Sequence, residues 1–426
     1  MTSQIEPKRP MQLHIIGLGV AQMARLDESA TRVLQSAAVV IGSERQLAVV
    51  SALVGSTQQL KLPSLKELRE VLARFSDQGV SSVAVLASGD PLYFGIGRWF
   101  GRHFDPQQLR FYPAVSSVQA ACHRLGLSLQ DVTVVSLHGR PVEKIRTRLK
   151  RNQQLVILTD KHSTPQALAR ECIAAGLSES TLWVCESLGY EQEQVQSHSA
   201  KEMVACKTVF DPLHVTIIQT RGPGGMLPEF PGITDDRFVT DGPAGKGMLT
   251  KREVRLTILS LMQVCDGDII WDIGAGCGGV AVELSYWNER SQVYAIEHHP
   301  ERLRCLEANR QRFGVVSNLT LVPGRAPEAL VDLPRADRVF IGGSDGELAG
   351  LLSLVWANLA EGGILVASAV AETTKQQLLS FFEQRQQRAD GLCETLQVAV
   401  SKGDLLAGQL LYRPGLPVTL FKFVKS

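Results

Sequence analysis

The hydrophobic and polar positions of this chain form short apolar runs separated by longer amphipathic stretches, which predicts strands alternating with helices. In the C-terminal half the expected strands are residues 268–273, 293–297, 319–322, 337–341, 363–368, 393–401 and 417–424. The expected helices there are residues 279–287, 300–313, 346–358 and 371–388. This alternation predicts a mostly parallel sheet with helices on both faces and an antiparallel hairpin at its end.

The N-terminal half shows the same alternation. Residues 11–19 are expected to form a strand that ends at two glycines, followed by a helix near 26–37 and a strand over 37–42. A further helix near 64–75 leads to a strand over 83–89. Strands and helices in this order form β-α-β units, so the pattern places both halves in the α/β class.

A segment rich in glycine and proline separates the two halves. Residues 221–247 contain seven Gly and four Pro, a composition that does not hold regular secondary structure. We therefore expect an N-terminal domain over residues 1–220, a linker over 221–247 and a C-terminal domain over 248–426. Just after the linker, Thr250 and Glu253 have the spacing of a helix capping box.

The composition narrows the functional classes. Lys and Arg total 44 against 43 Asp and Glu, so the chain lacks the basic excess that general nucleic-acid binding needs. No apolar run approaches the ~20 residues of a membrane span, and the first residues lack a hydrophobic signal segment, so we expect a cytoplasmic location without membrane contact. The eight cysteines form no C-x-x-C pair, and we expect no metal site.

The first candidate for chemistry is the apolar run 268–273, which stops abruptly in a cluster of glycines. Gly274, Gly276 and Gly279 satisfy the G-x-G-x-x-G spacing of dinucleotide sites. Gly274, Gly276 and Gly278 satisfy the G-x-G-x-G spacing found in many methyltransferases. Both describe a strand, a tight turn and a helix whose first amide groups can approach a ligand. The spacing alone leaves NAD and S-adenosylmethionine open.

Two carboxylates favour S-adenosylmethionine over NAD. Asp272 stands at the strand tip just before the first glycine, where it would repel a pyrophosphate but favour the cationic ammonium and sulfonium groups of S-adenosylmethionine. Glu297 ends the next expected strand, where such folds present an acid to the ribose hydroxyls. We therefore expect a methyl-donor site at this turn.

Two further segments point to the methyl acceptor. The loop after the strand 337–341 lacks the Asn/Asp-Pro-Pro-aromatic motif by which enzymes methylating nucleic-acid amines bind their target. Its glycines and hydroxyl, including Gly343 and Ser344, suit a broad, flat substrate instead. At the start of the domain, Lys251, Arg252 and Arg255 are either solvated helix surface or contacts to an anionic substrate.

Residues 11–220 resemble the tetrapyrrole methylases. The resemblance is carried by the segments 89–97, 113–117, 155–160 and 188–191 in this order. It implies a fold of two α/β lobes, with S-adenosylmethionine in the cleft between them. The implied contacts are Gly89, Asp90, Pro91, Tyr93, Ser116, Ser117 and Leu158. One departure is the first loop, which reads Gly-Leu-Gly-Val-Ala-Gln over residues 17–22 where many members have G-x-G-Pro-Gly-Asp.

Residues 240–426 resemble the C15-methylating, decarboxylating enzymes of the cobalamin pathway. The matching segments are 250–255, 272–278, 325–330 and 341–344. The resemblance implies a Rossmann-like class I methyltransferase domain that binds S-adenosylmethionine at the glycine turn. Arg325 and Ala326 fall where such domains contact adenine, here through the main chain.

Together the two resemblances imply one bifunctional enzyme with two S-adenosylmethionine sites. The implied substrate is a tetrapyrrole, precorrin-6Y/6B, which would be methylated at C5 and C15 and decarboxylated at the ring C (C12) acetate to give precorrin-8. We also expect a homo-oligomer, because related enzymes commonly associate. The alternatives are an S-adenosylmethionine-dependent RNA methyltransferase and a nucleotide-dependent oxidoreductase or sensor built on the same glycine turn.

Overall fold

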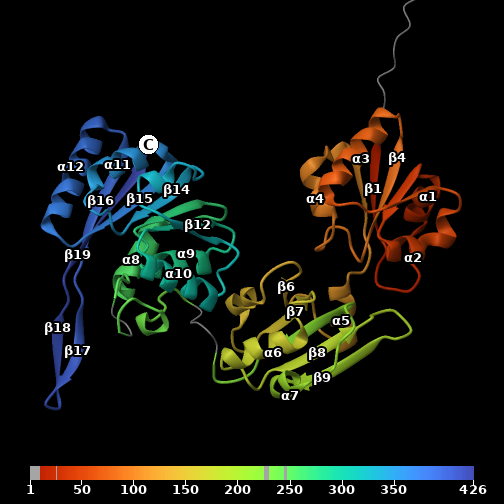
Figure 1. The fold of residues 1–426 in the computed structure, drawn as a ribbon, viewed down its shortest axis with the longest axis horizontal. Helices are drawn as coiled ribbons and strands as arrows, with labels where there is room; N and C mark the ends of the chain where they lie inside the picture. The colour runs from red at the N-terminus through yellow and green to blue at the C-terminus, as the bar shows by residue number, and fades with distance from the viewer. Residues whose placement is uncertain (1–9, 25, 225–229, 244–246) are drawn as a thin grey trace, which may run out of the picture. The chain divides into compact units, whose positions relative to one another are not determined.

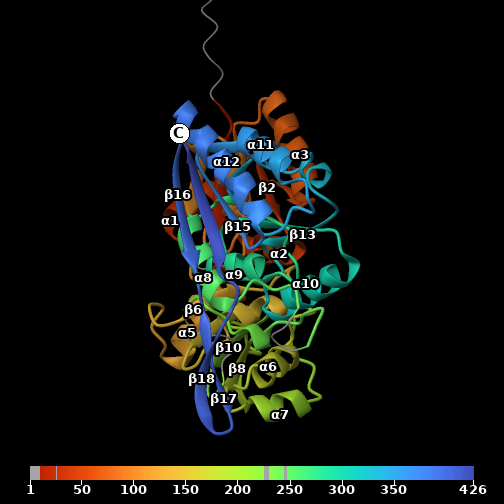
Figure 2. The same ribbon diagram turned by 90° about the vertical axis from the view of Figure 1, so that its left-hand side faces the viewer.

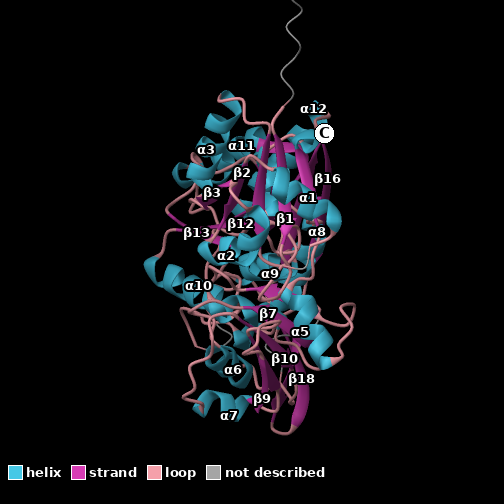
Figure 3. Cartoon of the chain, turned by 90° about the vertical axis from the view of Figure 1, so that its right-hand side faces the viewer, coloured by secondary structure: helices cyan, strands magenta, loops and turns pink. Residues whose placement is uncertain are grey.

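The computed structural model describes residues 10–24, 26–224, 230–243 and 247–426, and the chain divides into two compact units. Helices and strands alternate along most of both (Figures 1 and 3). Parts of the predicted linker, residues 225–229 and 244–246, lie outside the described residues. The first unit is Met1–Gly139, Asn152–Ile173 and Ser178–Gly222, and the second is Arg140–Arg151, Ala174–Leu177 and Pro223–Ser426.

The first sheet of the first unit is parallel, with strand order β3-β2-β4-β1-β5. Its interior strand β1, which lies between β4 and β5, is buried on both faces: Leu13 and Ile15 pack with α3 and α4, and Ile16 packs with α1 and α2. Burial on both faces explains the continuous apolar run. The elements are β1 Gln12–Gly17, α1 Glu28–Ser36, β2 Val39–Gly42, α2 Glu44–Val54, β3 Gln58–Lys61, α3 Leu65–Asp77, β4 Ser82–Ala87, α4 Gly97–His103 and β5 Leu109–Tyr112.

The second sheet of the first unit has the order β6-β7-β10-β8-β9, in which β6 and β7 are parallel and the other neighbours are antiparallel. Its helix α5 begins with a capping box in which Ser116 and Gln119 satisfy each other's backbone amides. The elements are α5 Ser117–Leu125, β6 Thr133–Ser136, β7 Gln154–Leu158, α6 Pro165–Ala174, β8 Thr181–Glu186, β9 Gln194–Ser199, α7 Ala200–Ala205 and β10 His214–Gln219.

The second unit contains a seven-stranded sheet of order β13-β12-β11-β14-β15-β19-β16. The first five strands are parallel, and β19 runs antiparallel to both of its neighbours. Helices α8, α9 and α10 cover one face, and α11 and α12 cover the other. The elements are α8 Arg252–Met262, β11 Ile269–Ile273, α9 Gly279–Trp287, β12 Gln292–Glu297, α10 Pro300–Arg312, β13 Leu319–Pro323, β14 Ala336–Ile341, α11 Leu348–Asn358, β15 Leu359–Ala369, α12 Glu372–Arg388, β16 Gly391–Val398 and β19 Val418–Lys425.

Two further strands form a ribbon that the sequence pattern did not predict. The strands β17 (Ser401–Leu406) and β18 (Gln409–Pro414) pair with each other as a separate two-stranded sheet. Figures 1 and 2 show them continuing beyond the seven-stranded sheet as a narrow arm. Because side chains alternate across a strand, Leu405, Leu410 and Tyr412 share one face, and all three are exposed.

The predicted α/β class and the mostly parallel C-terminal sheet are confirmed. The predicted capping box at Thr250 and Glu253 is wrong, because α8 begins one residue later than that motif requires. Lys251 occupies the N-cap position and makes no side-chain cap bond there. The carbonyl of Thr250 instead accepts a hydrogen bond of 2.5 Å from Arg255.

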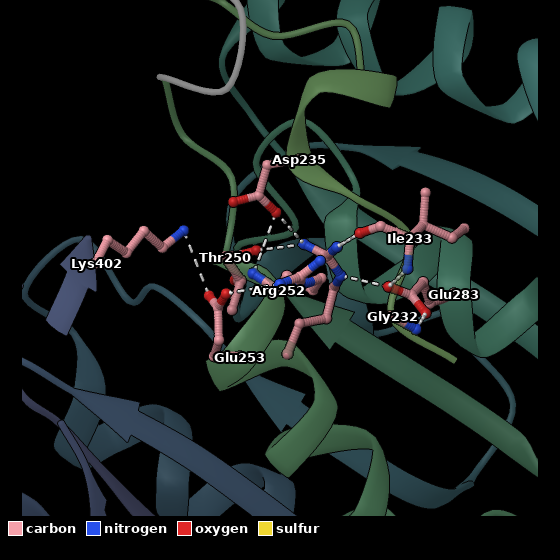
Figure 4. Close-up of polar contacts among 9 residues, drawn as sticks. Gly232, Ile233, Asp235, Thr250, Arg252, Glu253, Glu283 and Lys402 are labelled. Atoms are coloured by element: carbon pink, nitrogen blue, oxygen red, sulfur yellow. Dashed lines mark hydrogen bonds and ion pairs between the residues drawn. The ribbon is translucent and has the colours of Figure 1, made fainter. Parts of the chain in front are cut away.

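Arg255 is the centre of a buried polar network in the second unit. Figure 4 labels several residues of this network, including Glu283 and Asp235. Its side chain is fully buried and lies 2.6 Å from the Glu283 carboxylate and 3.1 Å from Asp235. It also donates to the carbonyls of Thr250 and Ile233. The network therefore ties the segment before α8 to helix α9.

Glu283 completes this network from the side of α9. Its carboxylate accepts the backbone amides of Gly232 at 2.8 Å and Ile233 at 3.1 Å, and the indole of Trp287 at 3.1 Å. The buried charge of Arg255 is therefore paired and surrounded by hydrogen bonds, as a buried ion pair requires.

We expect Arg255→Ala to lower the free energy of unfolding of the second unit by roughly 3–5 kcal/mol, because it leaves the Glu283 carboxylate buried without its cation. Urea denaturation measures this change. The matched control is Arg252→Ala on the same helix, whose partly exposed side chain pairs with Glu253. It should change the same quantity by less than about 1 kcal/mol, and equal effects of the two substitutions would contradict the role assigned to Arg255.

Candidate functional site

The glycine turn after β11 is shaped by two close backbone approaches. Gly274 has a φ of +72° and Gly276 a φ of +58°, a region that favours glycine. A Cβ on Gly274 would lie 2.7 Å from the amide nitrogen of Gly343, and a Cβ on Gly276 would lie 2.5 Å from the carbonyl oxygen of Met248. The two glycines therefore let the turn pack directly against the loop after β14 and the segment before α8.

A cavity of about 360 Å³ lies at this turn. It opens at the carboxyl ends of the parallel strands β11, β12 and β14, where ligands bind in open α/β sheets. Its walls combine main-chain groups of glycine loops with a small number of charged side chains. The lining residues are Gly247, Met248, Leu249, Thr250, Lys251, Val254, Ile273, Gly274, Ala275, Gly276, Ile296, Glu297, His298, Arg302, Gly324, Arg325, Ala326, Gly342, Gly343, Ser344, Asp345, Ser368, Val370 and Val418.

Glu297 joins the turn to the end of β12. One carboxylate oxygen accepts the amide of Gly276 at 2.9 Å, and the other accepts the amides of His298 and His299, both at 2.9 Å. A carboxylate offers about four acceptor positions, so these three bonds leave room for one further donor such as a hydroxyl. Glu297 therefore both shapes the cavity and can bind a ligand in it.

Asp272 is buried beneath the turn, outside the lining of the cavity. Its side chain is 1% exposed, and neither carboxylate oxygen has a partner with hydrogen-bond geometry among the described residues. Burial raises the pKa of Asp272 to about 7, and the nearby charge of Glu297 adds to the increase. The amide of Ala281 favours the ionised form but opposes only part of this shift.

The segment before α8 forms the outer wall of the cavity. Asp241 holds it, because one oxygen accepts the amide of Met248 at 2.8 Å and the other pairs with Arg302 at 3.2 Å. The hydrogen bond from Met248 holds the pKa of Asp241 below its ordinary value, and Arg302 acts in the same direction. The carbonyl of Met248 accepts the amide of Cys277 at 2.9 Å, which fixes the segment on the glycine turn.

Most of the C-terminal residues predicted from the sequence meet at this cavity. Those that line it are Lys251, Gly274, Gly276, Glu297, Arg325, Ala326, Gly343 and Ser344. Gly278, Arg252 and Asp272 lie outside the lining. The structure corrects the prediction for Arg255, which is fully buried with its guanidinium bound to Glu283 and Asp235 and is not placed to contact a substrate.

Three ionisable residues that line the cavity, His298, Arg302 and Asp345, were not predicted as site residues. Nδ1 of His298 lies 3.2 Å from Asp345 and 3.6 Å from Glu297. These contacts join the loop after β12 to the loop after β14. Only their positions in the sequence could have indicated a role in the site, since each residue closely follows a strand of the parallel sheet.

A second cavity, of about 110 Å³, lies in the first unit. It opens at the carboxyl ends of β1, β2 and β4, and Ser117 at the start of α5 and two later residues, Tyr190 and Leu213, also line it. Of the residues implied by the tetrapyrrole-methylase resemblance, Gly89 and Ser117 line this cavity, whereas Asp90, Pro91, Tyr93, Ser116 and Leu158 do not. The lining residues are Leu18, Gly19, Val20, Ala21, Arg45, Gln46, Val49, Ser88, Gly89, Ser117, Tyr190 and Leu213.

Asp90 organises the loop that follows β4. One carboxylate oxygen accepts the amides of Leu92 at 2.8 Å and Tyr93 at 2.9 Å, and the other accepts the amide of Ala114 at 3.3 Å. Asp90 therefore fixes two loops at the edge of the first sheet, and any contact with a ligand would come in addition to this role.

Two further features of the described residues bear on the site. Within them, no group of three or more His, Cys, Asp or Glu side chains is arranged to hold a metal ion. None of the helices that the structure describes has the length and apolar character needed to cross a bilayer.

Comparisons with known proteins match two segments of the chain to two different families. The profile of the tetrapyrrole (corrin/porphyrin) methylases matches residues 12–204, and that of the precorrin methyltransferase domain matches residues 238–425. A precorrin-6Y C(5,15)-methyltransferase [decarboxylating] from Sinorhizobium sp is 34% identical over 417 residues, which cover 97% of this chain and 96% of that protein. The chain belongs to the precorrin-6Y C5,15-methyltransferase (decarboxylating) family.

Other relatives agree with this family. The protein of the same name from Mycobacterium tuberculosis (strain ATCC 25618 / H37Rv) is 31% identical over 96% of this chain and 99% of its own length. A probable cobalt-precorrin-6B C(15)-methyltransferase (decarboxylating) from Methanothermobacter thermautotrophicus is 39% identical over 34% of this chain and 72% of its own length.

Membership of the precorrin-6Y C5,15-methyltransferase family confirms that the chain is a methyltransferase. Methyltransferases of this family use S-adenosylmethionine, so the choice of methyl donor over NAD is confirmed as well. The alternative of an RNA methyltransferase finds no support among these relatives.

We expect Asp272→Asn to change how stability depends on pH. Because the pKa of Asp272 is raised to about 7, the folded domain binds this proton more tightly than the unfolded chain. The contribution of Asp272 to wild-type stability therefore falls as pH rises from about 4 to about 7. Without cofactor, the variant should gain ~2–4 kcal/mol relative to wild type between pH 4 and pH 8, measured by urea denaturation.

The matched control for this experiment is Asp266→Asn, whose exposed carboxylate pairs with Arg290 at the surface. Its stability difference from wild type should stay nearly constant over the same pH range. A flat difference for Asp272→Asn would show that the carboxyl group ionises normally.

Proposed function

We propose that this chain methylates C5 and C15 of a precorrin and removes carbon dioxide from the ring C acetate, giving precorrin-8. The N-terminal domain, residues 1–220, would methylate C5, and the C-terminal domain, residues 248–426, would methylate C15 and decarboxylate. The observation that carries the proposal is a separate cavity in each part, at the carboxyl ends of parallel strands. The relative named for C15 methylation, at 39% identity over 34% of the chain, supports the division of labour.

The C-terminal cavity fits S-adenosylmethionine. A Cβ on Gly274 or Gly276 would collide with neighbouring backbone, so glycine at both positions lets the turn pack closely and line the cavity without a side chain. Glu297 retains acceptor capacity for a ribose hydroxyl. Gly324, Arg325 and Ala326 would line the adenine end of the site.

Methyl transfer requires the protein mainly to position its two reactants. When bound, S-adenosylmethionine supplies a methyl group on an electrophilic sulfonium carbon. The chain then has to hold the substrate carbon in line with that group and keep the substrate in one orientation. Gly343 allows a flat ring system to approach closely, and Lys251 at the cavity wall offers a cation to the substrate carboxylates.

Decarboxylation follows naturally from methylation at C15. Methylating the electron-rich bridge carbon leaves an electron-poor conjugated ring. The electron pair of the acetate C–C bond can pass into this ring as carbon dioxide leaves, which neutralises the ring and leaves a methylene carbon. Uptake of one proton at that carbon and loss of one proton from the ring system then give the methyl group. One domain can therefore perform both steps on a substrate held in one place.

The N-terminal site would hold a second S-adenosylmethionine. Gly89 and Ser117 line the cavity there, and Asp90 keeps the surrounding loops in position. Pro91, Tyr93, Ser116 and Leu158 remain predicted contacts on the strength of the resemblance.

We further propose that the chain forms homo-oligomers through the β17–β18 ribbon. Leu405, Leu410 and Tyr412 form one apolar face and are 71%, 60% and 70% exposed. An isolated two-stranded hairpin is only marginally stable in water, so this face needs a cover. The ribbon of a second copy has the same apolar face and free strand edges.

A cytoplasmic location also remains a prediction.

Two matched substitutions test the division of labour. Asp272→Ala should lower C15 methylation and decarboxylation by about 100-fold or more and spare C5 methylation, because it disturbs the base of one glycine turn. Asp90→Ala should do the reverse, because it releases the loops of the other cavity. Mass spectrometry of the products separates the two outcomes. Calorimetry should give two S-adenosylmethionine molecules per wild-type chain and one per variant.

A wild-type stoichiometry of one would contradict the two-site proposal. Loss of C5 methylation alone in Asp272→Ala would reverse the assignment of the domains.

The ribbon is tested by replacing Leu405 and Leu410 together with Ser. Burying each leucine stabilises by roughly 1.5–3 kcal/mol, so the double variant should weaken self-association by at least 100-fold, measured by sedimentation velocity. The control is Leu379→Ser on α12, which is 47% exposed and lies outside the ribbon. A wild-type chain that stays monomeric at micromolar concentration would contradict the proposal.

A further inference from the structure

The N-terminal cavity contains one charged side chain that neither the sequence motifs nor the comparisons assign. Of the described residues that line it, Arg45 alone carries a formal charge. Leu18, Val20, Val49 and Leu213 contribute apolar surface around it. Because the rest of the lining carries no formal charge, this single cation favours a ligand with a negatively charged group.

The neighbouring carboxylate does not neutralise Arg45. Glu44 precedes it in the chain but pairs with Lys61 at 2.5 Å. Arg45 also lies in the first turn of α2, where a cation opposes the helix dipole and does not stabilise the helix. The position is therefore unfavourable for the fold alone and consistent with a role in binding.

The hydrogen bonds of Arg45 leave donors rather than acceptors in the cavity. Nη2 of Arg45 donates to the hydroxyl of Ser88 at 3.1 Å, and Nε2 of Gln46 donates to the same hydroxyl at 3.0 Å. The oxygen of Gln46 accepts the amide of Ser43 in the capping box of α2. Two accepted bonds use the acceptor capacity of Ser88, so its proton is free to be donated.

This donor set selects a planar anion. A guanidinium carries five N–H donors in a rigid fork that matches the two oxygens of a carboxylate, and the Ser88 hydroxyl can add a further bond. The capping box at Ser43 and Gln46 fixes the first turn of α2, so Arg45 is presented from a rigid element. Gly89, predicted to contact the methyl donor, directly follows Ser88 and lines the same cavity.

We propose that Arg45 and Ser88 form a carboxylate subsite that binds an acetate or propionate side chain of the tetrapyrrole and so orients C5 toward the methyl donor. This inference rests on the proposed function of the N-terminal domain. The same chemistry would also fit the carboxylate of S-adenosylmethionine itself, so the experiment has to separate the two sources.

The test uses the full chain and compares Arg45→Gln, Arg45→Lys and Ser88→Ala with wild type. The readouts are KM and kcat for C5 methylation, the affinity of the N-terminal site for S-adenosylmethionine, and C15 methylation by the same preparation. Arg45→Gln should raise KM for the tetrapyrrole by about 10- to 100-fold. Its kcat for C5 methylation should fall as well, because a substrate held less firmly presents C5 to the methyl donor less often. Its donor affinity and C15 methylation should stay within about threefold of wild type. Arg45→Lys should recover part of the loss because it restores the charge but not the fork.

The control is Arg32→Gln on α1, an exposed arginine outside the cavity lining, which should leave all four quantities unchanged. A KM for Arg45→Gln equal to that of this control would overturn the subsite. A loss of donor affinity with an unchanged KM for the tetrapyrrole would assign the carboxylate to S-adenosylmethionine and overturn the substrate assignment. Absence of C5 methylation by the wild-type chain would instead refute the proposed function.

Discussion

The outer wall of the C-terminal cavity depends on a side chain that does not reach the cavity. Arg255 is fully buried, and its guanidinium holds the carbonyls of Ile233 and Thr250 on either side of the wall segment. Its pairing with Glu283 fixes that segment on α9. The wall residue Met248 can then bond to the glycine turn. A polar network in the core thus sets the shape of a site at the surface.

The parts of the site that depend on local backbone chemistry could be predicted from the sequence. The turn at Gly274 and Gly276 could be predicted from the local sequence, because only glycine readily adopts the required backbone angles and permits the close approach of neighbouring backbone. The position of Glu297 follows from the parallel order of strands, which places their carboxyl ends at one edge. The alternation of strands and helices could also be predicted, because hydrophobic periodicity is set by residues close together in the sequence.

The remaining features depend on residues far apart in the sequence. Arg255 has the sequence context of a surface cation on a helix, and its burial is decided by Glu283, which lies 28 residues later. Asp272 precedes the glycines, but strand geometry turns it under α9 with Ile270 rather than into the cavity. The β17–β18 ribbon carries leucines without a core partner among the described residues, so its hydrophobic pattern did not indicate a fold element.

The order of strands in the C-terminal sheet also has a consequence for synthesis. β19 covers residues 418–425 and lies between β15 and β16, so the last strand of the domain to be made is an interior strand of its sheet. Until it is inserted, β15 keeps an open hydrogen-bonding edge and β16 has no neighbour in the sheet. The first sheet of the N-terminal domain, by contrast, is complete by Tyr112. During translation, the C-terminal domain therefore completes its native sheet late. Until then, its exposed strand edges can pair with other chains.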